Sequence, residues 1–474
     1  MSTYNPGNQY RCTIIRGKSQ TEMEDLLPSY ASLVGQICPC TEDEFKSRAN
    51  DLMAMTLFRS PSFELLSAAN KKTVRNHITE IAGTLLGLYY VRRDDEINKN
   101  IVYESDSCRF LRETSDNTLF FKNLCLGFQF PNGENKVSVV REEFAKSIEI
   151  KPFCFVVAML KEAEKSKIRL RKQEIGYYAL NNLDVLQGKV SAHQVVSRIL
   201  EDRELGVKHS PLSGSRDWQH INEQFNLLAL TNIVEQDATC IWLNPNESPT
   251  AKLFVKEQGN FRISPKGISD HSVHGIRKFI SDWRQSKGLM SDTLISLKPS
   301  ASKAGRAKMF KGNSTVMSTI DLGDAGEAIV FRLEQERIRA YKPRLASKVL
   351  LLGKTKGLGY DISSIEGDEN KANPEFARYI EVKATRRVTE PKFDQSWLDS
   401  VNLTSKEWIA AQQYGDYYNI YRVYFTKKKI IVVRIQNPFA LSQSGSIEVY
   451  PVAYQVNFGA SVIETRHEES LSDE

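Results

Sequence analysis

The chain has 474 residues, of which 41% are hydrophobic and 26% charged, and its formal net charge is +6. This length exceeds what one hydrophobic core usually supports, so we expect a soluble globular protein of two or three domains. No apolar run approaches the roughly 18 residues of a membrane span. The N-terminal segment also lacks the pattern of a secretory signal peptide. These features predict a cytoplasmic protein with no membrane partner, and the mild basic excess permits a nucleic-acid partner without requiring one.

The seven cysteines are odd in number and scattered, which favours reduced thiols over a disulfide framework. Only Cys38 and Cys40 lie close together in the sequence. A structural zinc site normally takes four ligands from two such clusters, and no second cluster follows at a suitable spacing. His271 and His274 are likewise more typical of a loop than of a metal site.

Residues 1–145 are predicted to form a mainly helical domain that recognises DNA. Apolar residues recur at helical spacing between positions 42 and 90. The stretch 67–77 predicts the start of a recognition helix with Asn70 as N-cap. The residues expected to contact DNA are Lys71, Lys72, Arg75 and Asn76. A solvated basic helix face would carry the same residues, and the pattern does not decide between the two.

Residues 146–286 resemble a winged-helix module in the order of their elements, and we expect a second DNA-recognition domain here. The expected elements are a helix over 153–165, a short strand over 168–170, a helix over 172–181, and a further helix that opens at the N-cap Ser191. On this last helix Gln194 and Arg198 are candidate DNA contacts.

Another helix is expected over residues 217–233, with its polar face formed by Arg216, Gln219 and Asn222. These side chains suit the donor and acceptor pattern of the DNA major groove, although ordinary surface helices carry them too. After this helix, residues 239–243 and 251–255 are predicted to be the two strands of a hairpin, or wing.

Residues 287–319 lose regular periodicity and are predicted to be a linker, because the run 298–308 is small, polar and basic. Its cations could follow DNA phosphates, although a solubilising linker would look the same. These cations are Lys303, Arg306, Lys308 and Lys311.

The C-terminal domain, residues 320–474, carries the residues most typical of catalysis. Glu327 lies near the start of a predicted helix that runs to about residue 340, and Asp361 follows a glycine-rich turn. In the alternating strand predicted over 378–385, Glu381 and Lys383 are two apart and project from one face, while their neighbours enter the core.

If the strand of Asp361 pairs with that of Glu381, the two carboxylates can bind a hard divalent cation such as Mg²⁺ through oxygen. Lys383 would position or deprotonate the attacking water, and the metal would stabilise charge on a scissile phosphate. Glu-x-Lys on its own is more often a solvated strand face. Only the combination of the four residues points to a nuclease site.

The order of Glu327 on a helix, then Asp361, then Glu381-x-Lys383 resembles the PD-(D/E)xK nuclease superfamily. The surrounding runs GDAGE, GYDI, YIEVKAT, LTSKEW and YRVY are similar to the NO VEIN C-terminal type of that domain over roughly residues 320–440. Tyr360 stands where the superfamily's name has proline. The resemblance implies an α/β/α fold with a mixed central sheet, and Mg²⁺ as cofactor with Mn²⁺ able to substitute.

Residues Gln413 and Tyr417 are similar to a glutamine and tyrosine pair that some superfamily members place on a following helix near the site. We include them as possible accessory residues.

A DNA-reading region joined to a nuclease domain without a Walker loop resembles the Type IIS restriction endonucleases. This resemblance implies recognition of a short duplex sequence and cleavage at a displaced position. It also implies double-stranded DNA as partner, a homodimer or homotetramer on DNA because duplex DNA has two strands, and a cognate methyltransferase as a separate chain. Two alternatives stay open: an anti-phage or repair nuclease of other specificity, and a non-catalytic winged-helix DNA-binding regulator.

Overall fold

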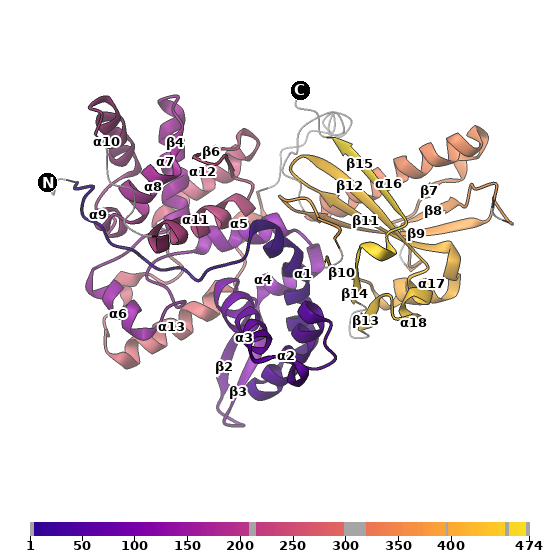
Figure 1. Cartoon of the computed structure of the whole chain (residues 1–474), viewed down its shortest axis with the longest axis horizontal. Coiled ribbons are helices and arrows are strands. Elements are labelled where there is room, and N and C mark those ends of the chain that lie inside the picture. Colours follow the sequence, from indigo (N-terminus) through magenta and orange to yellow (C-terminus); the bar gives the residue numbers. More distant parts are fainter. Residues whose placement is uncertain are drawn as a thin grey trace. The chain divides into compact units, whose positions relative to one another are not determined.

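A computed structural model of the chain describes residues 4–470 except 208–214, 298–318, 354, 356, 371, 395–396 and 451–454. It divides into two compact units (Figure 1). Unit 1 comprises residues 1–20, 37–109 and 118–297. Unit 2 comprises residues 21–36, 110–117 and 298–474, so two segments from the N-terminal part of the chain are packed within the C-terminal unit. In the described part of the chain, no helix is long and apolar enough to cross a membrane.

Unit 1 is mainly helical, with two small antiparallel sheets of three strands in the orders β1-β3-β2 and β4-β6-β5. Its described elements are β1 (Cys40–Thr41), α2 (Glu42–Phe58), η1 (Phe63–Leu65), α3 (Ala68–Asn76), η2 (His77–Leu85), β2 (Tyr89–Asp94), β3 (Lys99–Glu104), α5 (Asn117–Gly127), α6 (Val137–Ala145), α7 (Pro152–Lys165), β4 (Leu170–Arg171), α8 (Lys172–Ile175), η3 (Gly176–Leu180), α9 (Leu183–Leu186), α10 (Ala192–Glu204), α11 (Ser215–Leu230), β5 (Val234–Gln236), β6 (Cys240–Leu243), η4 (Pro245–Glu247), α12 (Ser248–Lys256), η5 (Glu257–Gly259), η6 (Pro265–Gly267), α13 (Val273–Lys287) and α14 (Asp292–Ile295).

Unit 2 contains most of helix α1 (Gln20–Ile37) and the end of α4 (Asp106–Thr114) together with a six-stranded mixed sheet. Its other described elements are α16 (Thr319–Tyr341), η7 (Pro343–Lys348), β7 (Leu350–Leu351), β8 (Ile362–Ile365), β9 (Ala377–Arg386), β10 (Asp399–Asn402), α17 (Ser405–Tyr414), η8 (Gly415–Tyr417), β11 (Tyr418–Phe425), β12 (Lys429–Gln436), α18 (Pro438–Gln443), β13 (Glu448–Tyr450), β14 (Gln455–Phe458), η9 (Ala460–Val462) and β15 (Thr465–Ser470).

Helix α7 of unit 1 is buried along most of its length and packs against α10 and α12. It begins at Pro152, where a proline costs no hydrogen bond because the first helical N–H groups have no partner within the helix. Helix α10 begins after Ser191, whose hydroxyl accepts the N–H of Gln194 while the Gln194 side chain accepts the N–H of Ser191. The predicted helix over 153–165 and the N-cap at Ser191 are therefore confirmed.

The predicted strand over residues 251–255 is wrong, because this run lies in helix α12. Ala251, Leu253 and Phe254 are buried on one side of that helix. A short apolar run does not distinguish a buried helix from a strand, and the prediction chose the wrong period. Strand β6 does form as predicted over residues 240–243, but its antiparallel partners are β4 and β5.

Three local predictions also change. Ser67, not Asn70, caps helix α3, because the Ser67 hydroxyl accepts the N–H of Asn70. The helix predicted over 172–181 forms as two pieces, α8 and the π-helical turn η3.

In the predicted linker, residues 287–297 belong to unit 1 and carry α14, whose Leu294 is buried. The four predicted linker cations lie outside the described residues.

Glu143 on α6 carries a buried carboxyl whose two oxygens have no hydrogen-bond partner in the part of the chain that the structure describes. Burial raises its pKa from 4.5 to about 8, and the neighbouring Glu134 and Glu142 add to this. Between these two pH values the unfolded chain releases the proton while the folded chain keeps it. The stability of unit 1 should therefore fall as the pH rises from 4.5 to about 8 and then level off.

In Glu143→Gln this part of the pH dependence should disappear. The slope of the free energy of unfolding against pH should then differ from wild type by at most about 1.4 kcal/mol per pH unit. Hydrogen exchange of the α6 amides at pH 5.5 and pH 8 measures it. The exposed Glu204→Gln is the matched control and should keep the wild-type slope. Equal slopes in Glu143→Gln and the wild type would contradict the prediction.

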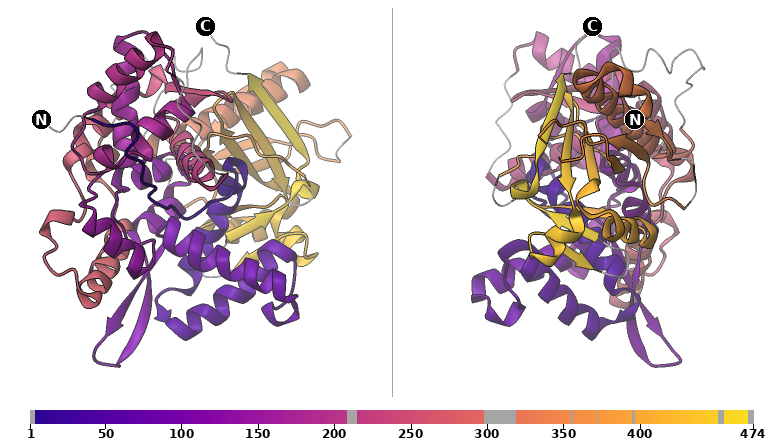
Figure 2. Two further views of the ribbon diagram at one scale, coloured as in Figure 1. Left: turned by 60° about the vertical axis from the view of Figure 1, so that its left-hand side comes forward. Right: turned by 90° about the vertical axis from the view of Figure 1, so that its right-hand side faces the viewer.

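The six-stranded sheet of unit 2 has the order β15-β12-β11-β9-β8-β7 and lies between helices on both faces (Figures 1 and 2). All its pairings are antiparallel except that of β9 with β11. Helix α16 packs on the face that presents Ile380 and Val382, with Ile329 and Ile338 in the same core. Helix α17 covers the opposite face. The predicted mixed central sheet in the C-terminal region is confirmed.

Candidate active site

Asp361 lies directly before β8, next to the strand that carries Glu381. The Asp361 N–H donates to the carbonyl oxygen of Ile380 at 2.8 Å, and the Val382 N–H donates to the Asp361 carboxylate at 2.9 Å. Strand β8 pairs antiparallel with β9 in the register Ile362 to Ile380. The condition set by the sequence, that these two strands pair, is therefore met.

Glu381 and Lys383 project from the face of β9 that α17 covers. Strand alternation sends their neighbours Ile380 and Val382 into the core beneath α16, as predicted. The Lys383 Nζ lies 2.7 Å from Oε1 of Glu381 and 2.9 Å from Oε2 of Glu407 on α17. The Glu381 side chain is only 4% exposed and that of Lys383 is 22% exposed. This face of β9 is a buried charged cluster, and not a solvated strand face.

Burial raises the pKa of Glu381 well above its usual range, and the neighbouring Asp361 raises it further. Burial also raises the pKa of Asp361, although the Val382 N–H opposes this. For Lys383, burial opposes the charged form, but Glu381 and Glu407 outweigh it and raise the pKa above its ordinary value. A lysine held in its ammonium form is suited to orienting water or stabilising negative charge, and unsuited to removing a proton.

Glu327 stands on α16, which packs on the other face of the sheet. Helix α16 approaches β9 closely at Gly326, where a Cβ atom would lie 2.8 Å from the Ala384 side chain. The Glu327 carboxylate lies against Gly353, in the connection between β7 and β8, where a Cβ atom would collide with it. The preceding Leu352 donates its N–H to the carbonyl oxygen of Asp361 at 2.6 Å. The structure therefore places Glu327 beside the segment that bears Asp361.

Glu407 was not predicted from the sequence as a site residue, although it lies in the run LTSKEW that resembles the NO VEIN C-terminal domain. The signal was Thr404-x-x-Glu407, a capping box at the start of α17. The Glu407 carboxylate accepts the N–H of Thr404 at 2.9 Å, and the same oxygen accepts from Lys383. A capping box predicts a helix start but does not reveal which strand the carboxylate will face.

Gln413 and Tyr417 make no hydrogen bond or ion pair with the charged cluster within the described ranges. Gln413 is exposed on α17. The Tyr417 ring stacks on that of Phe376 with the ring centroids 4.5 Å apart. Their accessory role stays a prediction.

The end of β9 is fixed by acidic residues of the N-terminal segments that belong to unit 2. The buried Glu24 accepts the N–H groups of Val388 and Thr389, both at 2.7 Å. Asp25 pairs with the Arg387 guanidinium at 2.7 Å. These contacts hold the strand that carries the charged cluster in a defined position.

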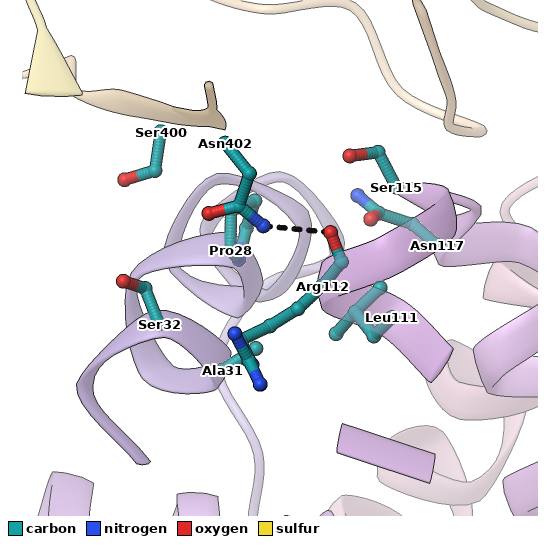
Figure 3. A pocket seen from close by; sticks show the side chains of 9 residues that line it. All are labelled: Pro28, Ala31, Ser32, Leu111, Arg112, Ser115, Asn117, Ser400 and Asn402. Atoms are coloured by element: carbon teal, nitrogen blue, oxygen red, sulfur yellow. Dashed lines mark hydrogen bonds between the residues drawn. The ribbon is translucent and has the colours of Figure 1, made fainter. Parts of the chain in front are cut away.

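A small cavity lies in unit 2 among α1, the end of α4 and β10 (Figure 3). Its volume of about 20 Å³ suits a single water molecule and excludes a substrate. At its rim the Asn402 side chain donates to the carbonyl oxygen of Arg112 at 2.7 Å. The polar side chains that line it are Ser32, Arg112, Ser115, Asn117, Ser400 and Asn402.

The candidate DNA contacts of α3 lie in the last two turns of the helix, and two of them lie near Phe63. Lys72 and Arg75 are exposed. Lys71 pairs with Glu64 at 2.5 Å, and both Lys71 and Arg75 lie over the Phe63 ring. Asn76 is half-buried at the end of the helix.

The other candidate DNA contacts are distributed over α10 and α11. Gln194 is committed to the capping box of α10, and Arg198 pairs with the buried Asp202 at 2.9 Å. On α11, Arg216 is exposed, whereas Gln219 and Asn222 are half-buried. Gln194 and Arg198 therefore stabilise α10 and its surroundings within the folded protein.

Comparison with known families identifies both parts of the chain. The family described as "Restriction endonuclease BpuJI - N terminal" matches residues 4–284, more than half of the chain. The chain belongs to this family. The family described as "Protein NO VEIN, C-terminal" matches residues 326–435, so the predicted resemblance over the C-terminal domain is confirmed. The matched stretch contains Glu327 and Lys383 and all the residues between them.

The solved structures that are similar to this chain include one with a DNA-binding domain in its description. It is described as a "Crystal structure of pyrene- and phenanthrene-modified DNA in complex with the BpuJ1 endonuclease binding domain". The identity is 35% with a TM-score of 0.54, and the match covers 60% of this chain and 100% of the other. No curated protein matches the chain.

Proposed function

We propose that the protein is a Mg²⁺-dependent Type II restriction endonuclease, of the Type IIS kind, that binds a short duplex sequence and hydrolyses phosphodiester bonds at a displaced position. The observation that carries this proposal is the cluster of Asp361, Glu381 and Lys383 on paired strands of unit 2. It occurs in a chain whose N-terminal part belongs to a restriction-endonuclease family.

The layout of unit 2 supports a PD-(D/E)xK nuclease domain. A helix bearing Glu327 precedes the sheet, and helices cover the sheet on both faces. Asp361 lies directly before β8, and Glu381 lies on the adjacent strand β9. In unit 1, the three-stranded sheet β4-β6-β5 near helices α7 and α11 supports the winged-helix interpretation.

The donor set fits Mg²⁺, which prefers carboxylate oxygen and keeps several waters. Burial raises the pKa of both Asp361 and Glu381, and Asp361 raises that of Glu381 further, so a divalent cation would offset the cost of burying two carboxylate charges. In the described part of the chain no three carboxylate, histidine or cysteine side chains surround one point. The proposed ligands are therefore Asp361 and Glu381, with water completing the coordination.

The metal would supply Lewis-acid stabilisation of the charge that develops on the scissile phosphate. The protein's residues would do the rest. Lys383, held as an ammonium ion, would orient the attacking water or stabilise the phosphate charge. Glu327, beside the Asp361 segment, would help to hold the metal ion or the attacking water.

Double-stranded DNA is the proposed partner, supported by the similarity to a binding domain solved with DNA. Among the proposed DNA contacts, three have exposed side chains that solvent and DNA can reach: Lys72, Arg75 and Arg216. Because one centre cuts one strand, we propose that two or more subunits act together on duplex DNA, with a separate methyltransferase chain protecting the host sequence.

The test is cleavage of plasmid DNA by the full chain with Mg²⁺, with EDTA as control, followed by sequencing of the ends. We expect cleavage only with the metal, at fixed offsets from one short sequence. Cleavage at unrelated positions would indicate a nuclease of other specificity. Metal-independent binding without any cutting would indicate a regulator and would refute the proposal.

A further inference from the structure

Glu407 occupies a position in the charged cluster that the four-residue motif does not include. It stands on α17, which belongs to the connection between the parallel strands β9 and β11. Its side chain is 15% exposed, and its Oε2 lies 2.9 Å from the Lys383 Nζ. Lys383 is thus held between two carboxylates from different layers of unit 2, Glu381 on the sheet and Glu407 on the helix.

The helix cap fixes the orientation of the Glu407 side chain. The oxygen that pairs with Lys383 also accepts the N–H of Thr404, while the Thr404 hydroxyl accepts the N–H of Glu407. A carboxylate held reciprocally in this way has lost its rotamer freedom before the lysine binds it. The flexible Lys383 side chain, with four rotatable bonds, therefore pairs with a carboxylate whose orientation is already fixed by the helix cap.

The charges around Lys383 indicate what its contact with Glu407 would do when a metal ion is bound. A divalent cation bound to Asp361 and Glu381 would neutralise the negative charge of Glu381 and so weaken its attraction for Lys383. The cation would also repel the Lys383 ammonium group. Within the described residues Glu407 forms no hydrogen bond with Asp361 or Glu381, although its charge raises the pKa of both. Its attraction for Lys383 would persist when that of Glu381 is weakened.

We infer that Glu407 is a positioning residue for the proposed hydrolysis, holding the Lys383 ammonium group in place beside Glu381 while the metal site is occupied. This inference rests on the proposed function. Groups that orient a catalytic residue from behind typically contribute 10- to 100-fold to activity.

The test variant is Glu407→Gln, because glutamine also completes a capping box and so preserves the start of α17 while removing the charge. We expect kcat for DNA cleavage to fall about 10- to 100-fold, with KM for DNA and the midpoint of thermal unfolding close to wild type. The control is Glu369→Gln, which removes an equal charge from an exposed position of unit 2 and should leave kcat unchanged.

A double-mutant cycle separates positioning from an independent role. In a Lys383→Ala background, Glu407→Gln should cause no further loss, because the group it positions is gone. A wild-type kcat in the single variant, or an additional loss in the Lys383→Ala background, would overturn the inference.

A second measurement does not depend on cleavage. Acetylation of the full chain with a lysine-reactive ester, followed by peptide mass spectrometry, compares Lys383 with the exposed Lys406. We expect Lys383 to react several-fold faster in Glu407→Gln than in the wild type, with Lys406 unchanged. Equal reactivity in both proteins would refute the positioning contact. If the wild type did not cut DNA at all, the proposed function would fail, and this measurement would still decide whether Glu407 holds Lys383.

Discussion

Glu381→Gln and Lys383→Ala should each lower the rate of DNA cleavage by about a thousandfold or more while DNA binding stays within twofold of wild type. The metal-bound carboxylate and the ammonium group act on charge that develops in the transition state. Such interactions are worth several kcal/mol, and each 1.36 kcal/mol corresponds to a tenfold change in rate. Single-turnover cleavage measures the rate, and fluorescence anisotropy with Ca²⁺ in place of Mg²⁺ measures binding.

Loss of folding does not explain the expected result for Glu381→Gln. Burial disfavours the charged form of Glu381, so a neutral amide of the same shape removes a desolvation cost. We expect its thermal unfolding midpoint to equal or exceed that of the wild type. The exposed Glu369→Gln should behave as wild type in all three measurements. A Glu381→Gln protein that keeps more than a tenth of the wild-type rate would show that the catalytic centre lies elsewhere.

The parts of the site that were predicted best from the sequence are those set by residues close together in the chain. Strand alternation alone places Glu381 and Lys383 on one face and Ile380 on the other, because successive side chains in a strand point in opposite directions. The pairing of the Asp361 segment with β9 was a condition that sequence could state but not test. Antiparallel β8–β9 pairing satisfies that condition, and it joins residues 12 to 18 positions apart in the sequence, from Ile365–Ala377 to Ile362–Ile380.

What the sequence missed depends on contacts between distant parts of the chain. Glu407 pairs with Lys383 across 24 positions, and Glu24 binds the end of β9 across 364 positions. No periodicity or motif encodes such distances. The wrong strand prediction at residues 251–255 has a different cause, because a run of five residues fits either the helical or the strand period. The run forms helix α12, which packs against α7.

The largest stability effect is expected for Lys122 in unit 1. Its Nζ lies 2.8 and 2.7 Å from the two carboxylate oxygens of Glu247, and the two side chains are only 4% and 3% exposed. The Thr250 hydroxyl also donates to Glu247 at 2.8 Å. Lys122→Met leaves the Glu247 charge buried with no cation beside it, which should destabilise unit 1 by about 3–5 kcal/mol. Hydrogen exchange of the α5 and α12 amides measures the change without assuming that the two units unfold together.

Two comparison variants distinguish the loss of stability from one unpaired buried charge from the contribution of the intact ion pair to stability. Lys122→Met combined with Glu247→Leu removes both charges, and it should recover much of the lost stability because the desolvation cost disappears with the carboxylate. Lys161→Met breaks an ion pair with Glu164 whose side chains are 35% and 42% exposed, and it should change stability by less than about 1 kcal/mol. If Lys122→Met cost no more than Lys161→Met, water would have to reach Glu247, and the burial of the Lys122–Glu247 pair would be wrong.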